Sequence, residues 1–162
     1  MDMKKNARLR ELIAQPGIVV APGCHDGLTA RLIQKNGFQV AYMGGNGSMA
    51  SYLGIPDIGL STATEMITRA RYLAEILDIP LICDADTGYG DVSSVFRTVR
   101  AYEAAGVSGI HLEDQVMPKR CGAMVPSSYC RVVVTFTVTP GKDLEFSSMI
   151  ETVSLLMLSA NV

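Results

Sequence analysis

Residues 79–91 read IPLICDADTGYGD, and this stretch contains the three parts of a strand–turn–helix unit. An apolar run typical of a buried strand comes first, a glycine-rich turn follows, and Asp91 is well placed to cap a helix. Two aspartates, Asp84 and Asp86, lie where the apolar run meets the turn. The stretch therefore predicts an acidic group at the carboxyl end of a buried strand.

The segments on either side repeat this alternation of short apolar run, turn and helical pattern. A capping box formed by Thr62 and Glu65 begins one helix. The other expected helices cover residues 7–15, 27–36 (capped by Asp26) and 92–105, and the expected strands cover residues 18–21, 39–43, 80–83 and 107–112. Strands and helices in short alternation predict an α/β fold with a parallel sheet or barrel.

The pattern changes at about residue 124. Residues 131–139 form a β-branched run that predicts a strand, and residues 144–158 are apolar with a possible helix. Neither continues the earlier repeat. We therefore divide the chain into a partial barrel over residues 1–123 and a divergent tail over residues 124–162.

Composition excludes several classes of function. The chain has 162 residues, enough for one domain, and a net charge of −2, which is not that of a nucleic-acid-binding surface. It contains no run of 18 apolar residues and no apolar segment after its basic start, so we expect neither a membrane span nor a signal peptide. The four cysteines lack the C-x-x-C spacing of a zinc site, and we expect a cytoplasmic protein.

The paired acids predict a divalent cation site. Residues i and i+2 of a strand point to the same face, and the carboxyl ends of parallel strands form the ligand site. Two carboxylates about 4 Å apart repel by roughly 4 kcal/mol at an effective dielectric of about 20, and a divalent cation reverses that repulsion. Oxygen ligands suit Mg²⁺ or Mn²⁺. The alternative, that Asp84 and Asp86 only begin a turn or cap a helix, is weakened because Asp91 already suits the cap.

Three further segments contribute to the expected site. Glu113 and Asp114 end the next strand but point to opposite faces, so only one of them can join the acids. Asp57 is another candidate, although its ordinary interpretation is a loop aspartate after proline. The turn at residues 44–47, GGNG, would let backbone N–H groups approach an anionic ligand, although most glycine-rich turns are only turns.

The tetrapeptide Lys119-Arg120-Cys121-Gly122 predicts a reactive thiol. Two flanking cations favour the thiolate of Cys121, which could then act as an acid–base or nucleophilic group. We expect Arg120 and Gly122 to contact the substrate, since glycine permits close backbone approach. The alternative is a basic surface loop with an incidental cysteine.

Five motifs in order resemble one family: VVAPGCHDGLTARL, YMGGNGSMASYLGIPDIG, ICDADTGYGD, AAGVSGIHLEDQV and PKRCG. Over residues 7–122 the chain is similar to the isocitrate lyase/phosphoenolpyruvate mutase superfamily, and most of all to its 2-methylisocitrate lyase, dimethylmalate lyase and oxaloacetate hydrolase types. The resemblance implies the N-terminal half of a (β/α)₈ barrel of the TIM type. It also implies Mg²⁺, a small 2-oxo or 2-hydroxy carboxylate substrate, an enolate intermediate and a homo-oligomer.

The resemblance also implies roles for the acidic residues. By motif, Asp84 is similar to the direct metal ligand of the family. Asp86, Asp57 and Glu113 resemble acids that reach the metal through water, and Asp57 is also expected to take part in catalysis.

The remaining motifs imply how the substrate is held and turned over. Gly44, Gly45 and Asn46 resemble the loop whose backbone binds the substrate carboxylate. Lys119 is similar to the lysine of the gating loop, and Cys121 resembles the catalytic acid–base of the lyases. These roles imply a Mg²⁺-dependent carbon–carbon lyase acting on a 2-oxo or 2-hydroxy di- or tricarboxylate.

The chain departs from the family pattern at several places. Gly44 stands where relatives often have serine, Ala123 stands where the lyase motif has histidine, and the similarity ends there. A full barrel needs eight strands and about 250 residues, whereas this chain shows four or five strands. We interpret the tail as a different reading of the gene or as genuine novelty. The alternatives to a lyase are a truncated or frameshifted inactive member and, more weakly, a phosphonate-forming mutase, which the K-R-C-G motif disfavours.

Overall fold

The computed structural model describes residues 3–115, 118–121 and 130–137. Its elements follow the chain in the order α1 (Met3–Ala14), β1 (Gly23–Cys24), α2 (Gly27–Lys35), β2 (Ala41–Met43), α3 (Gly45–Tyr52), α4 (Ala63–Ile76), β3 (Leu81–Asp84), α5 (Val92–Ala104), β4 (Gly109–Gln115) and β5 (Cys130–Thr137). Strands and helices alternate from β1 to β4, which confirms the predicted α/β class. No helix in the described part of the chain is long and apolar enough to cross a membrane.

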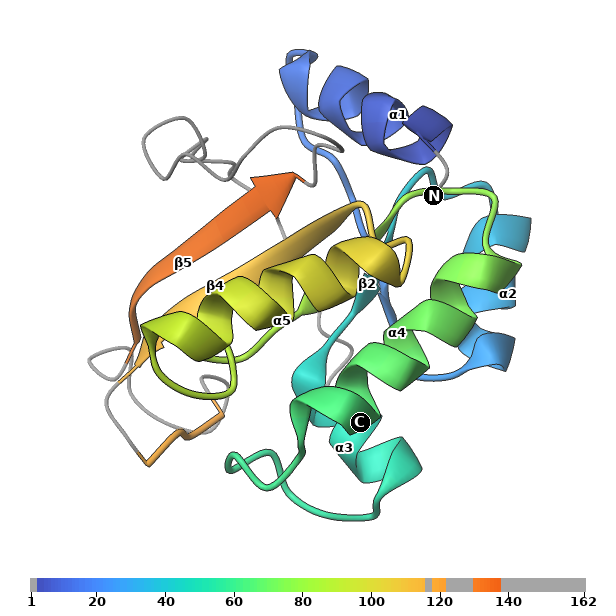
Figure 1. Ribbon diagram of the computed structural model, residues 1–162. Helices are drawn as coiled ribbons and strands as arrows, with labels where there is room; N and C mark the ends of the chain where they lie inside the picture. Colours follow the sequence, from blue (N-terminus) through green and yellow to red (C-terminus); the bar gives the residue numbers. More distant parts are fainter. Residues whose placement is uncertain (1–2, 116–117, 122–129, 138–162) are drawn as a thin grey trace.

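The strands form one sheet in the order β1-β2-β3-β4-β5. The pairings from β1 to β4 are parallel, as expected for the first strands of a (β/α) barrel. Strand β5 instead runs antiparallel to β4 along its edge, and the two ribbons lie side by side in Figure 1. The carboxyl ends of the parallel strands therefore meet at one edge of the sheet, where ligand sites form in such folds.

Side chains of the strands alternate between two faces of this sheet. Met43 and Cys83 belong to the main core, which is completed by buried residues of α2, α4 and α5. These three helices lie together over one face of the sheet (Figure 1). Ile82 points to the opposite face and packs with Leu9 and Leu12 of α1. Asp84, two residues after Ile82, therefore belongs to the face that α1 covers in part.

Local capping signals place α2, α4 and α5 where the sequence predicts them, whereas α1 begins at Met3, four residues before the expected helix over residues 7–15. The side chain of Asp26 accepts a hydrogen bond from the backbone N–H of Thr29, and Thr62 and Glu65 form the expected capping box. Asp91 accepts from the backbone N–H of Ser94 at 3.1 Å. Each cap satisfies backbone donors that the first helical turn leaves without partners.

The first strand lies further along the chain than predicted. We expected a strand over residues 18–21, but the structure has only an isolated bridge at Val20, and β1 covers Gly23–Cys24. The carbonyl oxygen of Pro22 accepts the N–H of Tyr42 at 3.0 Å. Proline therefore joins the ladder through its carbonyl, and its missing N–H does not end the pairing here.

The glycine-rich segment at residues 44–47 is not the loop that we predicted. Gly45 begins α3, and Gly44 is its N-cap in an extended conformation without a side-chain hydrogen bond. Glycine disfavours helices, so the sequence pattern argued against this assignment. A tertiary contact of Gly45, described below, explains why glycine is present.

Part of the predicted tail lies outside the described residues. Strand β5 (Cys130–Thr137) overlaps the expected strand over residues 131–139 and starts one residue earlier. The expected helix over residues 144–158 and the departure at Ala123 lie outside the described residues. The boundary between a partial barrel (1–123) and a divergent tail (124–162) stays a prediction.

Candidate metal and substrate site

Asp84 ends β3 and is fixed by two backbone donors. Its Oδ2 accepts the N–H of Gly45 at 3.1 Å, and its Oδ1 accepts the N–H of Asp86 at 2.8 Å. A Cβ atom on Gly45 would lie 2.6 Å from Asp84 Oδ2 and 3.4 Å from Asp57 Oδ2. The start of α3 thus approaches the carboxylate of Asp84 more closely than a side chain would allow, which favours glycine at this position.

A turn places Asp86 in the site, and not the strand alternation that we predicted. It lies beyond the last residue of β3 and has a left-handed backbone with φ of 52°, so the alternation of a strand does not orient it. Aspartate tolerates this conformation better than most residues. The carbonyl oxygen of Asp86 accepts the N–H of Glu113 at 2.9 Å, which ties the turn to β4.

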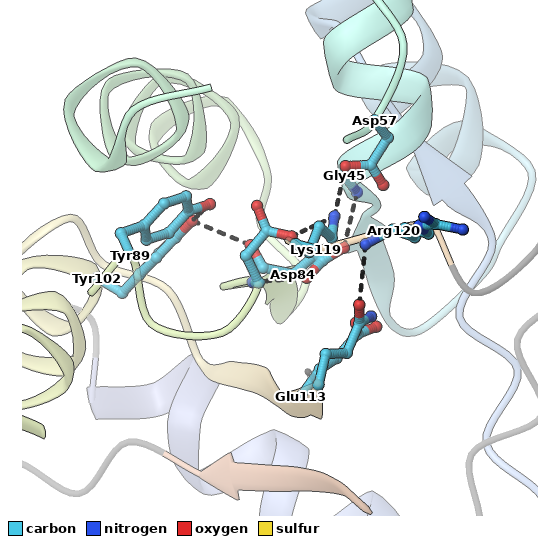
Figure 2. Close-up of polar contacts among 10 residues, drawn as sticks. Gly45, Asp57, Asp84, Tyr89, Tyr102, Glu113, Lys119 and Arg120 are labelled. Carbon is cyan, nitrogen blue, oxygen red and sulfur yellow. Dashed lines mark hydrogen bonds and ion pairs between the residues drawn. The ribbon is translucent and has the colours of Figure 1, made fainter. Parts of the chain in front are cut away.

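The ammonium group of Lys119 lies between two of the acids. It forms ion pairs with Asp57, in the segment between α3 and α4, and with Asp86. The Lys119 side chain is only 4% exposed, and both carboxylates are buried. Figure 2 shows Lys119, Asp57 and Asp84 converging from different elements, with Glu113 facing them from β4. The structure thus brings together Asp84, Asp86, Asp57 and Lys119, which come from three separate segments of the sequence.

Glu113 takes the inward position on β4, and its neighbour Asp114 is exposed. Only one of these two acids was expected to join the cluster, and the structure selects Glu113. Burial raises the pKa of Glu113, and the charges of Asp86 and Asp57 act in the same direction. The side-chain amide of Gln115 donates a hydrogen bond to Glu113 and so orients it.

Burial and mutual repulsion shift the acidity of the central pair. Burial raises the pKa of Asp84 to about 6, and the charges of Glu113 and Asp57 add to the effect. Burial also raises the pKa of Asp86 to about 6, with the charge of Asp84 as the next cause. Burial disfavours the ammonium of Lys119, but the charge of Asp86 and hydrogen bonds to Asp57 and Asp86 outweigh it and raise the pKa of Lys119. An added positive charge would therefore stabilise the ionised carboxylates of the cluster.

The donor set fits a hard divalent cation in its chemistry. Four carboxylates face one region, and carboxylate oxygens are the ligands that Mg²⁺ and Mn²⁺ prefer. Among residues 3–115, 118–121 and 130–137, however, no three Asp, Glu, His or Cys side chains are arranged as a ready metal cage. Lys119 instead contacts Asp57 and Asp86, so the acids hold an ammonium group at this point.

The reactive-cysteine motif is only partly described. Cys121 is a buried thiol. Lys119 directs its charge to carboxylates, and Arg120 is exposed with its backbone N–H bonded to Gln115 Oε1 at 3.1 Å. Gly122 lies outside the described residues. The predicted activation of Cys121 by two flanking cations stays a prediction, with Lys119 engaged elsewhere in this arrangement.

The expected carboxylate-binding backbone lies at the start of α3. Gly44 is the N-cap, Gly45 is buried, and Asn46 is exposed in the first turn. The N–H of Gly45 is already donated to Asp84. Of the three, Gly45 therefore serves the acid cluster in this structure, and substrate contacts by Gly44 and Asn46 remain predictions.

Sequence reasoning missed the aromatic residues around the acids. The hydroxyl of Tyr102 donates to the carbonyl oxygen of Asp84 at 3.0 Å, and the Tyr89 hydroxyl lies 3.5 Å from that of Tyr102 (Figure 2). On the inner face, the rings of Tyr42 and His111 lie 5.2 Å apart. Burial lowers the pKa of His111 to about 4. The helical spacing of apolar residues in α5 indicates that Tyr102 belongs to the core, and nothing local indicates its bond to β3.

Known proteins share this arrangement of motifs. A family model described as phosphoenolpyruvate phosphomutase matches residues 9–146. A 2,3-dimethylmalate lyase of Eubacterium barkeri is 54% identical over 123 residues, which are 76% of this chain and 43% of that protein. A probable 2-methylisocitrate lyase of Corynebacterium glutamicum is 48% identical over 74% of this chain and 38% of its own length. The chain thus spans less than half the length of these relatives.

Solved structures agree with the sequence match. An oxaloacetate acetylhydrolase in complex with 3,3-difluorooxalacetate superimposes with a TM-score of 0.72 and 41% identity, covering 79% of this chain and 43% of that one. The structural neighbours are TIM-barrel proteins, and one is a 2,3-dimethylmalate lyase described as a member of the PEP mutase/isocitrate lyase superfamily. Because the family model matches most of its length, the chain belongs to the phosphoenolpyruvate phosphomutase family.

Proposed function

We propose that this chain carries the metal-binding part of a Mg²⁺-dependent carbon–carbon lyase. The substrate class is a 2-oxo or 2-hydroxy di- or tricarboxylate, as in the dimethylmalate and methylisocitrate lyases that it resembles. The observation that carries the proposal is the convergence of four carboxylates. Asp84 at the end of β3, Glu113 on β4 and Asp57 face one region (Figure 2). Asp86 shares the Lys119 ammonium group with Asp57. A related structure, of a phosphonopyruvate hydrolase 33% identical to this chain, is a complex with oxalate and Mg²⁺.

The acids would hold the metal with unequal roles. Asp84 is fixed at both oxygens and supplies the most rigid ligand, whereas Asp86, Asp57 and Glu113 line the sides of the same region. A bound Mg²⁺ supplies Lewis-acid stabilisation of the negative charge that develops on a substrate oxygen during cleavage. The bond from Tyr102 to the Asp84 carbonyl keeps the end of β3 in place.

We assign proton transfer to the K-R-C-G segment. Cleavage of a carbon–carbon bond next to a carboxylate leaves a carbanion equivalent that must take up a proton. Cys121 is the candidate donor, through its Sγ atom, and Lys119 and Asp57 are the candidates to orient the substrate. The presence of this cysteine favours a lyase over a phosphonate-forming mutase.

A second candidate function is a non-catalytic family member. It is favoured by the coverage of relatives, since the chain matches 43% of the dimethylmalate lyase and 38% of the methylisocitrate lyase. Such a protein would keep the acid cluster and bind a divalent cation without completing the substrate site. Metal binding without turnover would therefore identify it.

The test measures Mg²⁺-dependent release of a 2-oxo acid from 2,3-dimethylmalate and 2-methylisocitrate, and loss of oxaloacetate, by the full 162-residue chain. We expect turnover that disappears in Asp84→Asn, because the amide replaces a fixed anionic ligand. Asp114→Asn is the matched control, since this exposed acid lies outside the cluster. A folded, soluble wild-type chain that converts none of the three substrates would overturn the lyase proposal.

A further inference from the structure

The charged group of Lys119 is paired inside the protein and is not exposed to solvent. Its ammonium group is buried and contacts two carboxylates, Asp57 and Asp86, that come from different parts of the chain. Lysine is almost never fully buried unless it is paired. The pairing therefore defines the position of Lys119, and the side chain acts as a cation that the protein itself supplies to the acid cluster.

The single positive charge of Lys119 is smaller than the negative charge that the four carboxylates of the cluster can carry. One ammonium group faces Asp84, Asp86, Asp57 and Glu113, all of which influence one another through their charges. An ammonium group brings one charge and three donors, whereas a divalent cation brings two charges at a single point. Both would draw on the same oxygens of Asp57 and Asp86.

We propose that Lys119 and a divalent cation are alternative occupants of the acid cluster, so that metal entry displaces the Lys119 ammonium from Asp57 and Asp86. This inference deepens the proposed function and rests on it, because it assumes that the cation binds through these acids. Lys119 is then an internal counter-ion that keeps the buried carboxylates paired until a metal arrives.

The segment that carries Lys119 permits such a displacement. Residues 118–121 form no helix or strand, and Pro118 and Arg120 on either side of the buried lysine are exposed. A lysine side chain has four rotatable carbon–carbon bonds, so its ammonium can reach solvent without unfolding of its neighbours. Removing one member of a buried pair leaves the other charge uncompensated, and the arriving cation provides that compensation for Asp57 and Asp86.

The exchange has a direct chemical readout in the wild-type chain. Acetylation with an amine-reactive ester, followed by mass spectrometry, measures how accessible each lysine is. We expect slow labelling of Lys119 in EDTA and at least about fivefold faster labelling in saturating Mn²⁺. Lys35 is the internal control, because it is exposed on the last turn of α2 and should label equally in both conditions. Unchanged Lys119 labelling at a Mn²⁺ concentration that binds would overturn the exchange.

A variant tests the same inference through affinity. Lys119→Met keeps an unbranched side chain one atom shorter than lysine and removes its charge, so Mn²⁺ no longer competes with an ammonium group. We expect the Mn²⁺ dissociation constant, measured by calorimetry on the full chain, to fall by roughly tenfold or more. Lys35→Met removes one positive charge at the surface and should leave the constant unchanged. Equal or weaker binding by Lys119→Met would contradict the competition.

The outcomes separate this inference from the proposed function. Wild-type binding of Mn²⁺ that depends on Asp84, with Lys119 labelling unchanged, would leave the metal site standing and remove the exchange. Failure of both wild type and Lys119→Met to bind Mn²⁺ would overturn both proposals. Tighter binding by Lys119→Met without any change of labelling in the wild type would show simple charge repulsion, and the displacement would be wrong.

Discussion

The backbone N–H of Gly45 donates to Asp84 Oδ2 at 3.1 Å, and a Cβ on Gly45 would lie 2.6 Å from that same oxygen. One glycine at the start of α3 therefore sets the position of a carboxylate at the end of β3. The hydrogen bond fixes Asp84, and the missing side chain makes room for it. The helix start and the strand end are thus one structural unit.

Gly45→Ala is expected to break this unit. Glycine-to-alanine changes within helices usually stabilise by about 0.5–1 kcal/mol, but here the added methyl group forces Asp84 aside. We expect the free energy of unfolding in urea to fall by about 1–3 kcal/mol, together with loss of Mn²⁺ binding. Gly47→Ala in the same helix is the control, since its Cβ would meet His25 at an ordinary 3.5 Å. Equal stabilities of the two variants would refute the close-approach argument.

Sequence-based prediction succeeded where the cause is local. The caps at Asp26, Thr62 and Asp91 depend on residues three positions away, and all three helices begin where predicted. The α3 helix was missed because its first turn is stabilised by a contact with Asp84, 39 positions away. No local preference reports such a contact.

In the acid cluster, too, local features could be predicted and long-range contacts could not. The identities of Asp84, Asp86, Asp57 and Glu113 followed from motifs, but their geometry did not. Asp86 joins through a left-handed turn instead of strand alternation, and Lys119 is buried by pairing with acids 62 and 33 positions earlier in the chain. Predicting that pairing requires the folded sheet, because neither the basic tetrapeptide nor the resemblance indicates which acids Lys119 contacts.

Asp86→Asn is expected to change how stability depends on pH. The pKa of Asp86 is raised from 3.8 to about 6, chiefly by burial and then by the charge of Asp84. Between these values the folded state binds a proton that the unfolded state has lost, so the wild type loses stability as pH rises from about 4 to 6. The asparagine variant does not titrate. Urea unfolding at pH 4 to 7 should therefore show the wild type gaining on the variant as pH falls, by up to about 3 kcal/mol.

Asp26→Asn provides a comparison of opposite sign. The backbone hydrogen bond from Thr29 lowers the pKa of Asp26, so this carboxylate stabilises the fold above its unfolded pKa and loses that effect as pH falls. The wild type should therefore lose ground to Asp26→Asn on acidification. Parallel pH profiles for the two variants would show that burial of Asp86 does not control its titration.

His111→Phe is expected to stabilise the protein. His111 is buried against Tyr42, and neither ring nitrogen has a hydrogen-bond partner among the described residues. Removing an unsatisfied buried polar group should raise the free energy of unfolding at pH 7 by about 1 kcal/mol. Burial lowers the pKa of His111 from 6.5 to about 4, so between these values only the unfolded state takes up the proton, and the wild type weakens as pH falls. The stability advantage of the phenylalanine variant over the wild type should grow by up to about 3 kcal/mol near pH 4.

His111→Gln separates the two effects, because it removes the titration but keeps a polar group. It should match His111→Phe in pH dependence without the gain in stability at pH 7. A phenylalanine variant whose stability follows that of the wild type across this range would mean that His111 has a polar partner in solution and is not held neutral by burial.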